Sequence, residues 1–335
     1  MHKFKYISIL WLNMVDKIKI DLVNRKILAE LDRNCRISLT ALGRKVGKSR
    51  EAVAYRIQQL QRVGVIKQFI TSINPHRLGS MMFKVYLKLE NIPDEREKFF
   101  AELKGNKDMY WVGISDGAFD CVFAILAKDV VKYYEKMNAL LSHWEHLIIS
   151  KVLGTMVDTR QYNKKFFIKT LGKHVIFGGK VVENKVDDAD LKILDILGNN
   201  ARIPLLQLAH NVGSSIEVVR RRIQKLEDKG IILGYRIAVD FNTLGMEFFK
   251  AIIYFRSLSG KDEKDLFAWM EAHPNSLYYI RSLAPWEAEL EFAVENYQQF
   301  NSIINDLRKR FPHVVRNYEH LIMIEETWLP AYRAK

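Results

Sequence analysis

The sequence has very little cysteine and no long apolar run, and each absence excludes a class of protein. Only Cys35 and Cys121 occur among the 335 residues, so the chain can build neither a disulfide framework nor a thiolate metal site. The most apolar stretch near the start, residues 6–12, is far shorter than the roughly 20 residues that a membrane-spanning helix needs. No small-residue cleavage site follows it. These features favour a cytoplasmic protein with no membrane partner.

The chain also lacks the motifs that usually mark an enzyme. It has no glycine-rich phosphate loop, no nucleophile elbow and no pair of acids at catalytic spacing. Among its nine histidines, His143 and His146 lie three residues apart, but they flank Trp144 and have no third ligand nearby. We therefore expect neither an enzymatic activity nor a cofactor or metal.

Acidic residues are scarce relative to basic ones, and the shortage is local. The net charge is +13, which points to an anionic partner such as nucleic acid. Residues 16–79 carry 14 Lys/Arg against 5 Asp/Glu, a balance of +9, whereas residues 186–245 carry 8 of each. Residues 160–185 add 7 Lys/Arg against Glu183 alone. We therefore expect residues 16–79 to bind this partner more tightly than residues 186–245 do.

The dominant feature that is present is an internal duplication. Residues 20–79 repeat at residues 186–245 without a gap, and 23 of the 60 aligned positions are identical. The likeness continues downstream, where Phe83-Lys84 recurs as Phe249-Lys250. Such self-similarity indicates a tandem repeat of one structural unit. The predicted divisions are an N-terminal extension (1–15), a helical domain (16–79), a second domain (80–158), a basic linker (159–185), and the second copies of the two domains (186–245 and 246–330).

Each helical domain has the pattern of a helix pair that reads DNA. In the first copy, apolar periodicity predicts helices over 21–31 and 38–46 and a third helix from Ser49 to about residue 62. Gly47 closes the second helix as the left-handed residue of a tight turn, and Ser49 is placed to cap the third. Alternating β-branched and aromatic residues then predict a strand or wing. The result is a winged helix-turn-helix, present twice.

The exposed face of the third helix is the predicted DNA-binding surface, because its basic and amide side chains suit phosphates and base edges. Arg56 and Arg222 could equally pair with a carboxylate of the first helix, and both readings stay open. In the second copy Ile216 and Glu217 are poor phosphate ligands, which predicts weaker binding. The candidates are Arg44, Lys45, Lys48, Ser49, Arg50, Tyr55, Arg56, Gln58, Gln59 and Arg62 in copy one, and Ser214, Ser215, Arg220, Arg221, Arg222, Gln224 and Lys225 in copy two.

The second half of each unit reads as a sheet with two helices. Strand patterns cover 81–90, 109–115, 119–127 and 147–157, and helical patterns cover 93–105 and 130–144, with counterparts in the second copy that include helices near 261–272 and 297–310. The order βαββαβ is that of a ferredoxin-like sheet, which carries helices on one face only. The predicted fold class is therefore α+β, with two winged helix-turn-helix and two ferredoxin-like domains.

The residues shared by the two copies also carry a family resemblance. Arg36-Ile37, Gly47, Ser49, Arg56-Ile57 and Gly64-Val65-Ile66, with their counterparts at an offset of 166, resemble the Lrp/AsnC family of transcriptional regulators. The resemblance covers roughly residues 16–158 and 186–330. It implies binding of double-stranded DNA through the third helix, followed by an effector and oligomerisation domain. Two copies in one chain would then pair as an intramolecular pseudo-dimer, with further self-association left open.

The resemblance also implies an effector site for an amino acid in the loop between the second and third strands of the sheet. Its candidate residues here are Asp116, Gly117, Phe119 and Asp120, although an ordinary tight hairpin explains Asp116-Gly117 equally well. The second copy departs from the pattern, because residues 282–287 hold a proline and no glycine.

Two other functions compete with a DNA-binding regulator. Siroheme decarboxylases resemble the same duplicated architecture, but residues 109–113 and 277–281, where their histidine motif would fall, contain no histidine. A ligand-sensing or interaction module without DNA binding would suit the neutral second copy. The balance of +9 in the first copy argues against that module, because a scaffold has no need to gather positive charge around a recognition helix.

Overall fold

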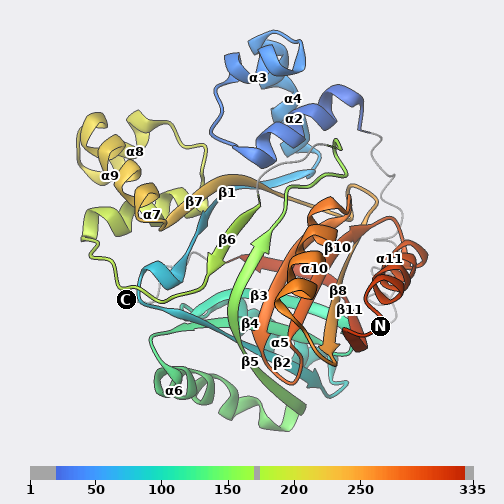
Figure 1. The fold of residues 1–335 in the computed structure, drawn as a ribbon. Helices are drawn as coiled ribbons and strands as arrows, with labels where there is room; N and C mark the ends of the chain where they lie inside the picture. The colour runs from blue at the N-terminus through green and yellow to red at the C-terminus, as the bar shows by residue number, and fades with distance from the viewer. Residues whose placement is uncertain (1–19, 170–173, 329–335) are drawn as a thin grey trace, which may run out of the picture.

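The computed structural model describes residues 20–169 and 174–328, so the predicted extension over 1–15 lies outside the described residues. Figure 1 shows two helical clusters at one end of a large closed sheet, with helices packed on the outside of that sheet. None of the helices in the described ranges is both long and apolar enough to cross a bilayer.

The first helical cluster contains α2 (Leu22–Arg33), α3 (Leu39–Val46) and α4 (Arg50–Arg62). Each helix begins where a side chain accepts a hydrogen bond from a free amide of its first turn, as the Ser49 Oγ does from the backbone N–H of Ala52 at 3.1 Å. Gly47 ends α3 with φ at 67°, a left-handed conformation that glycine adopts without strain. The predicted helix-turn-helix is therefore present.

The second cluster repeats this arrangement with α7 (Asp188–Asn199), α8 (Leu205–Val212) and α9 (Ile216–Asp228). Gly213 takes the place of Gly47 with φ at 73°, and Ser215 caps α9. Apolar residues from both clusters, such as Leu31 and Leu197, belong to one continuous core. The two clusters are thus one packed body and not two independent modules.

The strands that follow the helices hold the clusters together. β1 (Ile66–Ile73) pairs antiparallel with β7 (Ile232–Val239), so each strand has the other copy as its partner and forms no hairpin of its own. Two equivalent arginines reinforce the pairing. Arg36 donates to the backbone oxygen of Ala201 at 2.6 Å, and Arg202 donates to that of Cys35. This reciprocal exchange fixes the orientation of one cluster relative to the other.

The downstream halves have the predicted order βαββαβ. In the first unit the elements are β2 (Met81–Leu89), α5 (Pro93–Gly105), β3 (Met109–Gly117), β4 (Cys121–Ala127), α6 (Val130–Leu141) and β5 (Ile148–Gln161). In the second they are β8 (Glu247–Phe255), α10 (Gly260–Ala272), β9 (Ser276–Leu283), β10 (Ala288–Val294), α11 (Tyr297–Arg310) and β11 (Val315–Trp328). Short 3₁₀ turns, Pro75–Arg77 and Ser142–Leu147, precede β2 and β5.

The two four-stranded sheets join edge to edge at both sides. β3 of the first unit pairs with β11 of the second, and β9 of the second pairs with β5 of the first. Because β5 also pairs with β2, the eight strands close into a barrel, all of whose neighbours are antiparallel. The bare faces of the two sheets form its interior, and this is the intramolecular pseudo-dimer that the duplication predicts.

The segment predicted as a basic linker over 159–185 is instead largely built into the fold. β5 continues to Gln161, and β6 (Val175–Gly178) pairs back onto it. Between them Lys164 donates to the buried carboxylate of Asp32 on α2 at 2.7 Å, while Phe167 enters the core of the helical clusters. Counting charges and glycines missed these contacts, because Lys164 and Lys165 find partners that are distant in sequence.

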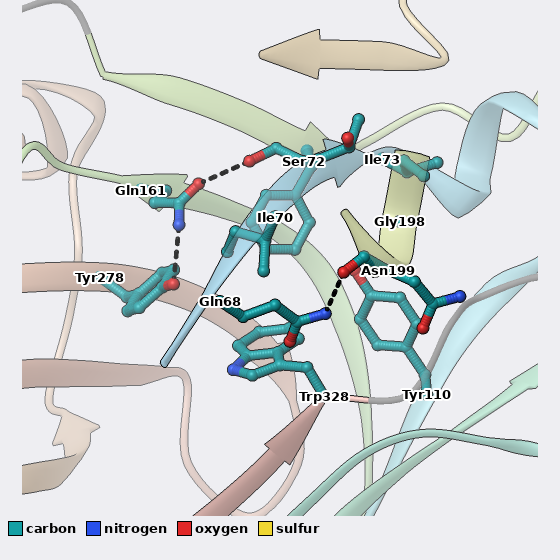
Figure 2. Close-up of a pocket in the computed structure, with 12 residues that line it drawn as sticks. Gln68, Ile70, Ser72, Ile73, Tyr110, Gln161, Gly198, Asn199, Tyr278 and Trp328 are labelled. Atoms are coloured by element: carbon teal, nitrogen blue, oxygen red, sulfur yellow. Dashed lines mark hydrogen bonds between the residues drawn. The ribbon is translucent and has the colours of Figure 1, made fainter. Parts of the chain in front are cut away.

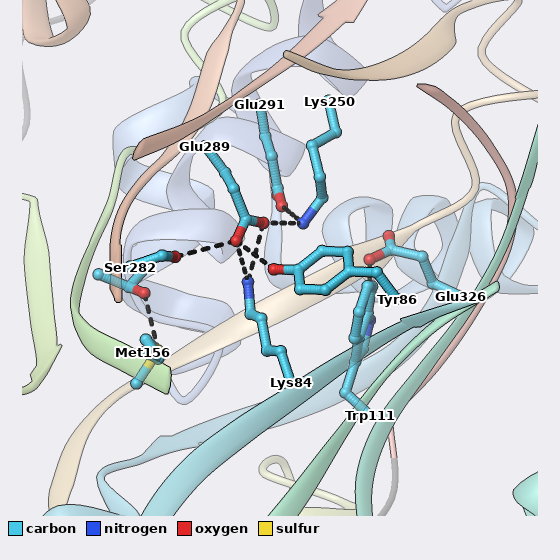
Figure 3. A network of polar contacts seen from close by, with 10 residues as sticks. Lys84, Tyr86, Trp111, Met156, Lys250, Ser282, Glu289, Glu291 and Glu326 are labelled. Atoms are coloured by element: carbon cyan, nitrogen blue, oxygen red, sulfur yellow. Dashed lines mark hydrogen bonds and ion pairs between the residues drawn. The ribbon is translucent and has the colours of Figure 1, made fainter. Parts of the chain in front are cut away.

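Charged side chains occupy the centre of the barrel. Glu289 is fully buried and accepts hydrogen bonds from Lys84 at 2.9 Å and Lys250 at 2.5 Å, as well as from Tyr86. Lys250 also pairs with Glu291 at 2.8 Å, and Figure 3 shows these groups converging between the two sheets. Burial alone would raise the pKa of Glu289, but the two lysines outweigh it and hold the pKa well below its usual range. The group therefore stays ionised.

We predict that Lys250→Met lowers the free energy of unfolding by about 3–5 kcal/mol, because it leaves the buried Glu291 without its cation and Glu289 with Lys84 alone. Lys104→Met, which removes an exposed ion pair to Glu325, should cost no more than about 1 kcal/mol. Urea denaturation of both variants measures the difference. Equal costs would contradict a structural role for the buried pair.

Candidate nucleic-acid interface

The solvent-facing side of α4 carries one continuous stripe of side chains. Glu51, Tyr55, Gln58 and Arg62 recur at intervals of three or four residues and are all exposed, which places them on one face of the helix. Tyr55 is 63% exposed, an unusual exposure for a large aromatic ring. The opposite face supplies Val53, Ile57 and Leu60 to the core. The helix is thus anchored on one side and open along the other.

Basic side chains surround the start of this stripe. Arg44 is exposed in the last turn of α3, Lys48 in the turn that follows and Arg50 at the first residue of α4. They make no side-chain hydrogen bond or ion pair with other residues of the described ranges. At the far end, Arg62 likewise has no such partner in the described part of the chain. The N-terminal amides of a helix favour anions. Cations and amides together therefore give this end of α4 the chemistry of a phosphate site.

Two of the predicted DNA contacts have carboxylate partners within the protein. Arg56 donates to the carboxylate of Asp21 at 2.7 Å, and Arg222 donates to Asp187 at 2.8 Å and to Asp190 at 2.7 Å. Both arginines therefore form the ion pair with the start of the first helix that the sequence offered as one reading, and contact of either with DNA stays a prediction. The backbone N–H of Asn24, followed by Arg56, holds the pKa of Asp21 below its usual value. These pairs tie the recognition helices to α2 and α7.

Three further candidates have local partners. The hydroxyls of Ser49 and Ser215 cap α4 and α9, so their oxygens already accept a hydrogen bond within the protein. Lys45 pairs with Glu30 at 2.5 Å. Gln59 is half-buried beside the core. The remaining candidates of copy one, Arg44, Lys48, Arg50, Tyr55, Gln58 and Arg62, form the exposed surface that we call the α4 surface.

The corresponding surface of copy two differs at most positions. Its stripe reads Glu217, Arg221, Gln224 and Asp228, so an acid replaces Arg62 at the far end. Arg220 pairs with Glu217 at 2.5 Å and Gln224 donates to Asp228 at 2.9 Å. Ser214 and Ile216 stand where copy one has Lys48 and Arg50. Arg221 and Lys225 are exposed, but the surface as a whole offers fewer unpaired cations.

The predicted effector loop is closed by its own contacts. Asp120 is 7% exposed, and its carboxylate accepts from the backbone N–H of Leu89 at 2.8 Å and pairs with Lys88 and Arg96. Phe119 packs against Tyr86 inside the barrel. Both candidates are therefore largely buried and have partners within the protein, and their contact with an effector stays a prediction. Asp116 and Gly117 remain exposed, at the point where β3 pairs with β11.

Sequence reasoning missed the residues that connect the copies. Arg36 and Arg202 were noted only as shared positions, and they prove to hold the two helical clusters together. Lys84 and Lys250 recur at equivalent places in two apolar strands, a signal that could have revealed a buried ionic site. Their acidic partners Glu289 and Glu291 have no counterpart in copy one, so internal symmetry could not have found them.

Comparison with known proteins agrees with this geometry. The AsnC-type helix-turn-helix domain matches residues 20–61, and the winged helix-turn-helix DNA-binding domain matches residues 186–232. The fold and the two matches together define a DNA-binding transcriptional regulator with two helix-turn-helix units in one chain. The chain belongs to the Lrp/AsnC family.

Several relatives support the family. The proline dehydrogenase transcriptional activator of Rhodobacter capsulatus is 32% identical over 132 residues, 38% of this chain and 84% of that protein. The leucine-responsive regulatory protein of Salmonella typhimurium is 28% identical over 164 residues, 47% of this chain and 99% of that protein. A solved structure of the siroheme decarboxylase NirDL covers 91% of both chains with a TM-score of 0.61 at 10% identity. This last likeness shows a shared fold.

We predict that Arg222→Ala destabilises the chain by about 1–3 kcal/mol, because the carboxylate of Asp190 loses its charged donor. That carboxylate is 2% exposed. The neighbouring Arg221→Ala, at an exposed position, should stay within about 0.5 kcal/mol of the wild type. Urea denaturation compares the two. If Arg222→Ala left stability unchanged and abolished DNA binding, Arg222 would be a DNA contact after all.

Proposed function

We propose that this regulator reads DNA mainly through the α4 surface, with α4 lying in the major groove and α9 contributing less. The observation that carries this proposal is the unpaired state of Lys48, Arg50 and Arg62, set against the paired or acidic residues of α9. Unpaired cations release counterions when they meet phosphates, and this release supplies most of the non-specific affinity for DNA. Tyr55 and Gln58 lie between them and are suited to base edges.

A single chain supplies both helix-turn-helix units in this proposal. In two-fold regulators the half-sites lie roughly 34 Å apart, one turn of the double helix. The Arg36 and Arg202 contacts make the spacing of the two units a fixed property of the fold. The operator would then have one strongly read half and one weakly read half. Such a regulator would act in the cytoplasm, where it meets the chromosome.

An amino-acid effector is the proposed signal, in line with the leucine-responsive relative. Within the predicted loop, Asp116 and Gly117 are the members that stay exposed. They border the pairing of β3 with β11, so a ligand there would act on the contact between the two units. Association of whole chains into larger assemblies is a further proposal that rests on the same family.

The unpaired cations of copy one lead to a prediction about DNA affinity. The double variant Lys48→Ala/Arg50→Ala should weaken binding to a random-sequence labelled duplex by about tenfold or more. The slope of log affinity against log salt concentration should also fall by the equivalent of about two phosphate contacts. The matched double variant in copy two, Ser214→Ala/Ile216→Ala, should change the affinity by less than about threefold. Fluorescence anisotropy at two salt concentrations measures both quantities. Equal losses of DNA affinity in the two double variants would contradict the proposal that copy one supplies most of the DNA contacts.

A second prediction separates the regulator from an enzyme of the same fold. Purified protein incubated anaerobically with siroheme should yield no decarboxylated product, because the positions matched to the histidine motif of siroheme decarboxylases hold Met109 to Gly113 and Leu277 to Arg281, without a histidine. Mass spectrometry of the extracted tetrapyrrole provides the measurement, with a siroheme decarboxylase as the positive control. Stoichiometric or catalytic loss of carbon dioxide would show that the fold carries the enzymatic activity here too.

A further inference from the structure

A cleft separates the β1–β7 strand pair from the open end of the barrel. Its outer part encloses about 270 Å³ and is bordered by both strands of the pair and by the end of β11. Gln161, Tyr278 and Trp328 line this part and also the adjoining cavity shown in Figure 2. Tyr278, Glu326 and Trp328 continue into a third cavity that reaches Lys250 inside the barrel. The three cavities share Tyr278 and Trp328 as lining residues, and we call them together the passage.

Aromatic rings form the walls where the passage narrows. Tyr110 and Trp328 meet edge to face with ring centres 5.8 Å apart, and Trp111 lies 6.2 Å from Trp328. Tyr278 lines the passage on the side of β9. The negative faces of such rings attract cations, most strongly where water is excluded. The walls thus favour a positively charged guest over a negatively charged one.

The charges at the inner end do not balance. Three acids, Glu289, Glu291 and Glu326, face two ammonium groups, and both of those lysines are bonded to Glu289, with Lys250 also bonded to Glu291. Glu326 accepts one hydrogen bond, from the indole N–H of Trp111 at 3.0 Å. Within the described ranges no cation pairs with it. A carboxylate at the end of an aromatic passage therefore lacks a counterion.

The groups around Glu326 also favour a bound cation. It faces Glu291 from β10, Lys250 from β8, Lys67 from β1 and Tyr278 from β9. Burial, followed by repulsion from Glu291, raises the pKa of Glu326 to about 7. Glu326 is half-buried. An unpaired carboxylate that is partly removed from water is costly to ionise, and a bound cation would remove that cost. Lys67 is not a full counterion for Glu326, because its ammonium group pairs with the carboxylate of Asp240 at 3.3 Å.

We infer that this passage binds a small organic ammonium ion, with its charge on Glu326 and its apolar part between the rings of Trp111, Tyr278 and Trp328. An anion is disfavoured, because the four lysines that line these cavities already have carboxylate partners. They are Lys67, Lys84, Lys164 and Lys250. The site is separate from the predicted effector loop. The inference does not depend on DNA binding, since it rests on the cavity, the rings and the charge imbalance alone.

The test uses the full chain and benzyltrimethylammonium, whose charge does not change with pH. Benzyl alcohol and benzoate serve as neutral and anionic probes of similar size. Isothermal titration calorimetry should show binding of the ammonium ion and not of the other two. Glu326→Gln keeps the shape of the side chain and removes an uncompensated charge, so the variant should fold and should bind the ammonium ion at least tenfold more weakly. Glu319→Gln, on the exposed part of the same strand, is the matched control and should bind normally.

The pH dependence gives an independent readout. Only the ionised form of Glu326 attracts the cation, so affinity should rise about tenfold from pH 6 to pH 8 as the carboxyl group loses its proton. In Glu326→Gln this rise should be absent. Three results would overturn the inference: no ammonium binding beyond that of benzyl alcohol, equal affinity in Glu326→Gln, or preferential binding of benzoate.

Discussion

The structure depends on one constraint, which is that neither ferredoxin-like sheet can bury its own edges and inner face. A four-stranded sheet alone would expose two rows of unpaired backbone groups. Here β3 pairs with β11 and β5 pairs with β9, so each unit covers the edges of the other. The bare inner faces then form a barrel interior, where Lys84 from one unit meets Glu289 from the other. The duplication supplies within one chain the partner that this closure requires.

Closure of the barrel also determines where the DNA-binding units lie. β1 and β7 leave the helical clusters and pair with each other, and the segment after β5 returns to place Lys164 against Asp32 of α2. The helical clusters are therefore held by contacts to each other and to the barrel. A regulator built in this way presents both recognition helices in one fixed orientation.

Comparing the copies separates structural residues from functional ones. Some positions that are identical in both copies, such as Gly47 and Gly213 or Arg56 and Arg222, end helices or hold them together, whereas the identical pair Gln58 and Gln224 is exposed. Positions that differ, such as Lys48 and Ser214, lie at the exposed surface. This comparison supports a first copy specialised for reading DNA and a second that completes the scaffold.

Local features of the fold were predictable from the sequence, and contacts between distant residues were not. The helix α5 has the predicted bounds, and the turn at Gly47 follows from the preference of glycine for left-handed conformations. The partners of Arg56, Lys164 and Glu326 depend on residues that the fold brings together from 32 to 215 positions away. Periodicity carries no information about such pairs, so the α4 surface could be only partly delimited and the barrel passage could not be foreseen.

The central claim is that one chain reads DNA asymmetrically, and selection of bound duplexes from a random-sequence pool tests it most directly. The purified chain would be equilibrated with the pool, and the retained fraction would be sequenced after several rounds. We expect an enriched motif with one strongly specified half-site and a second, weakly specified one about a helical turn away. A palindrome with two equally specified halves, or no enrichment at all, would contradict this account.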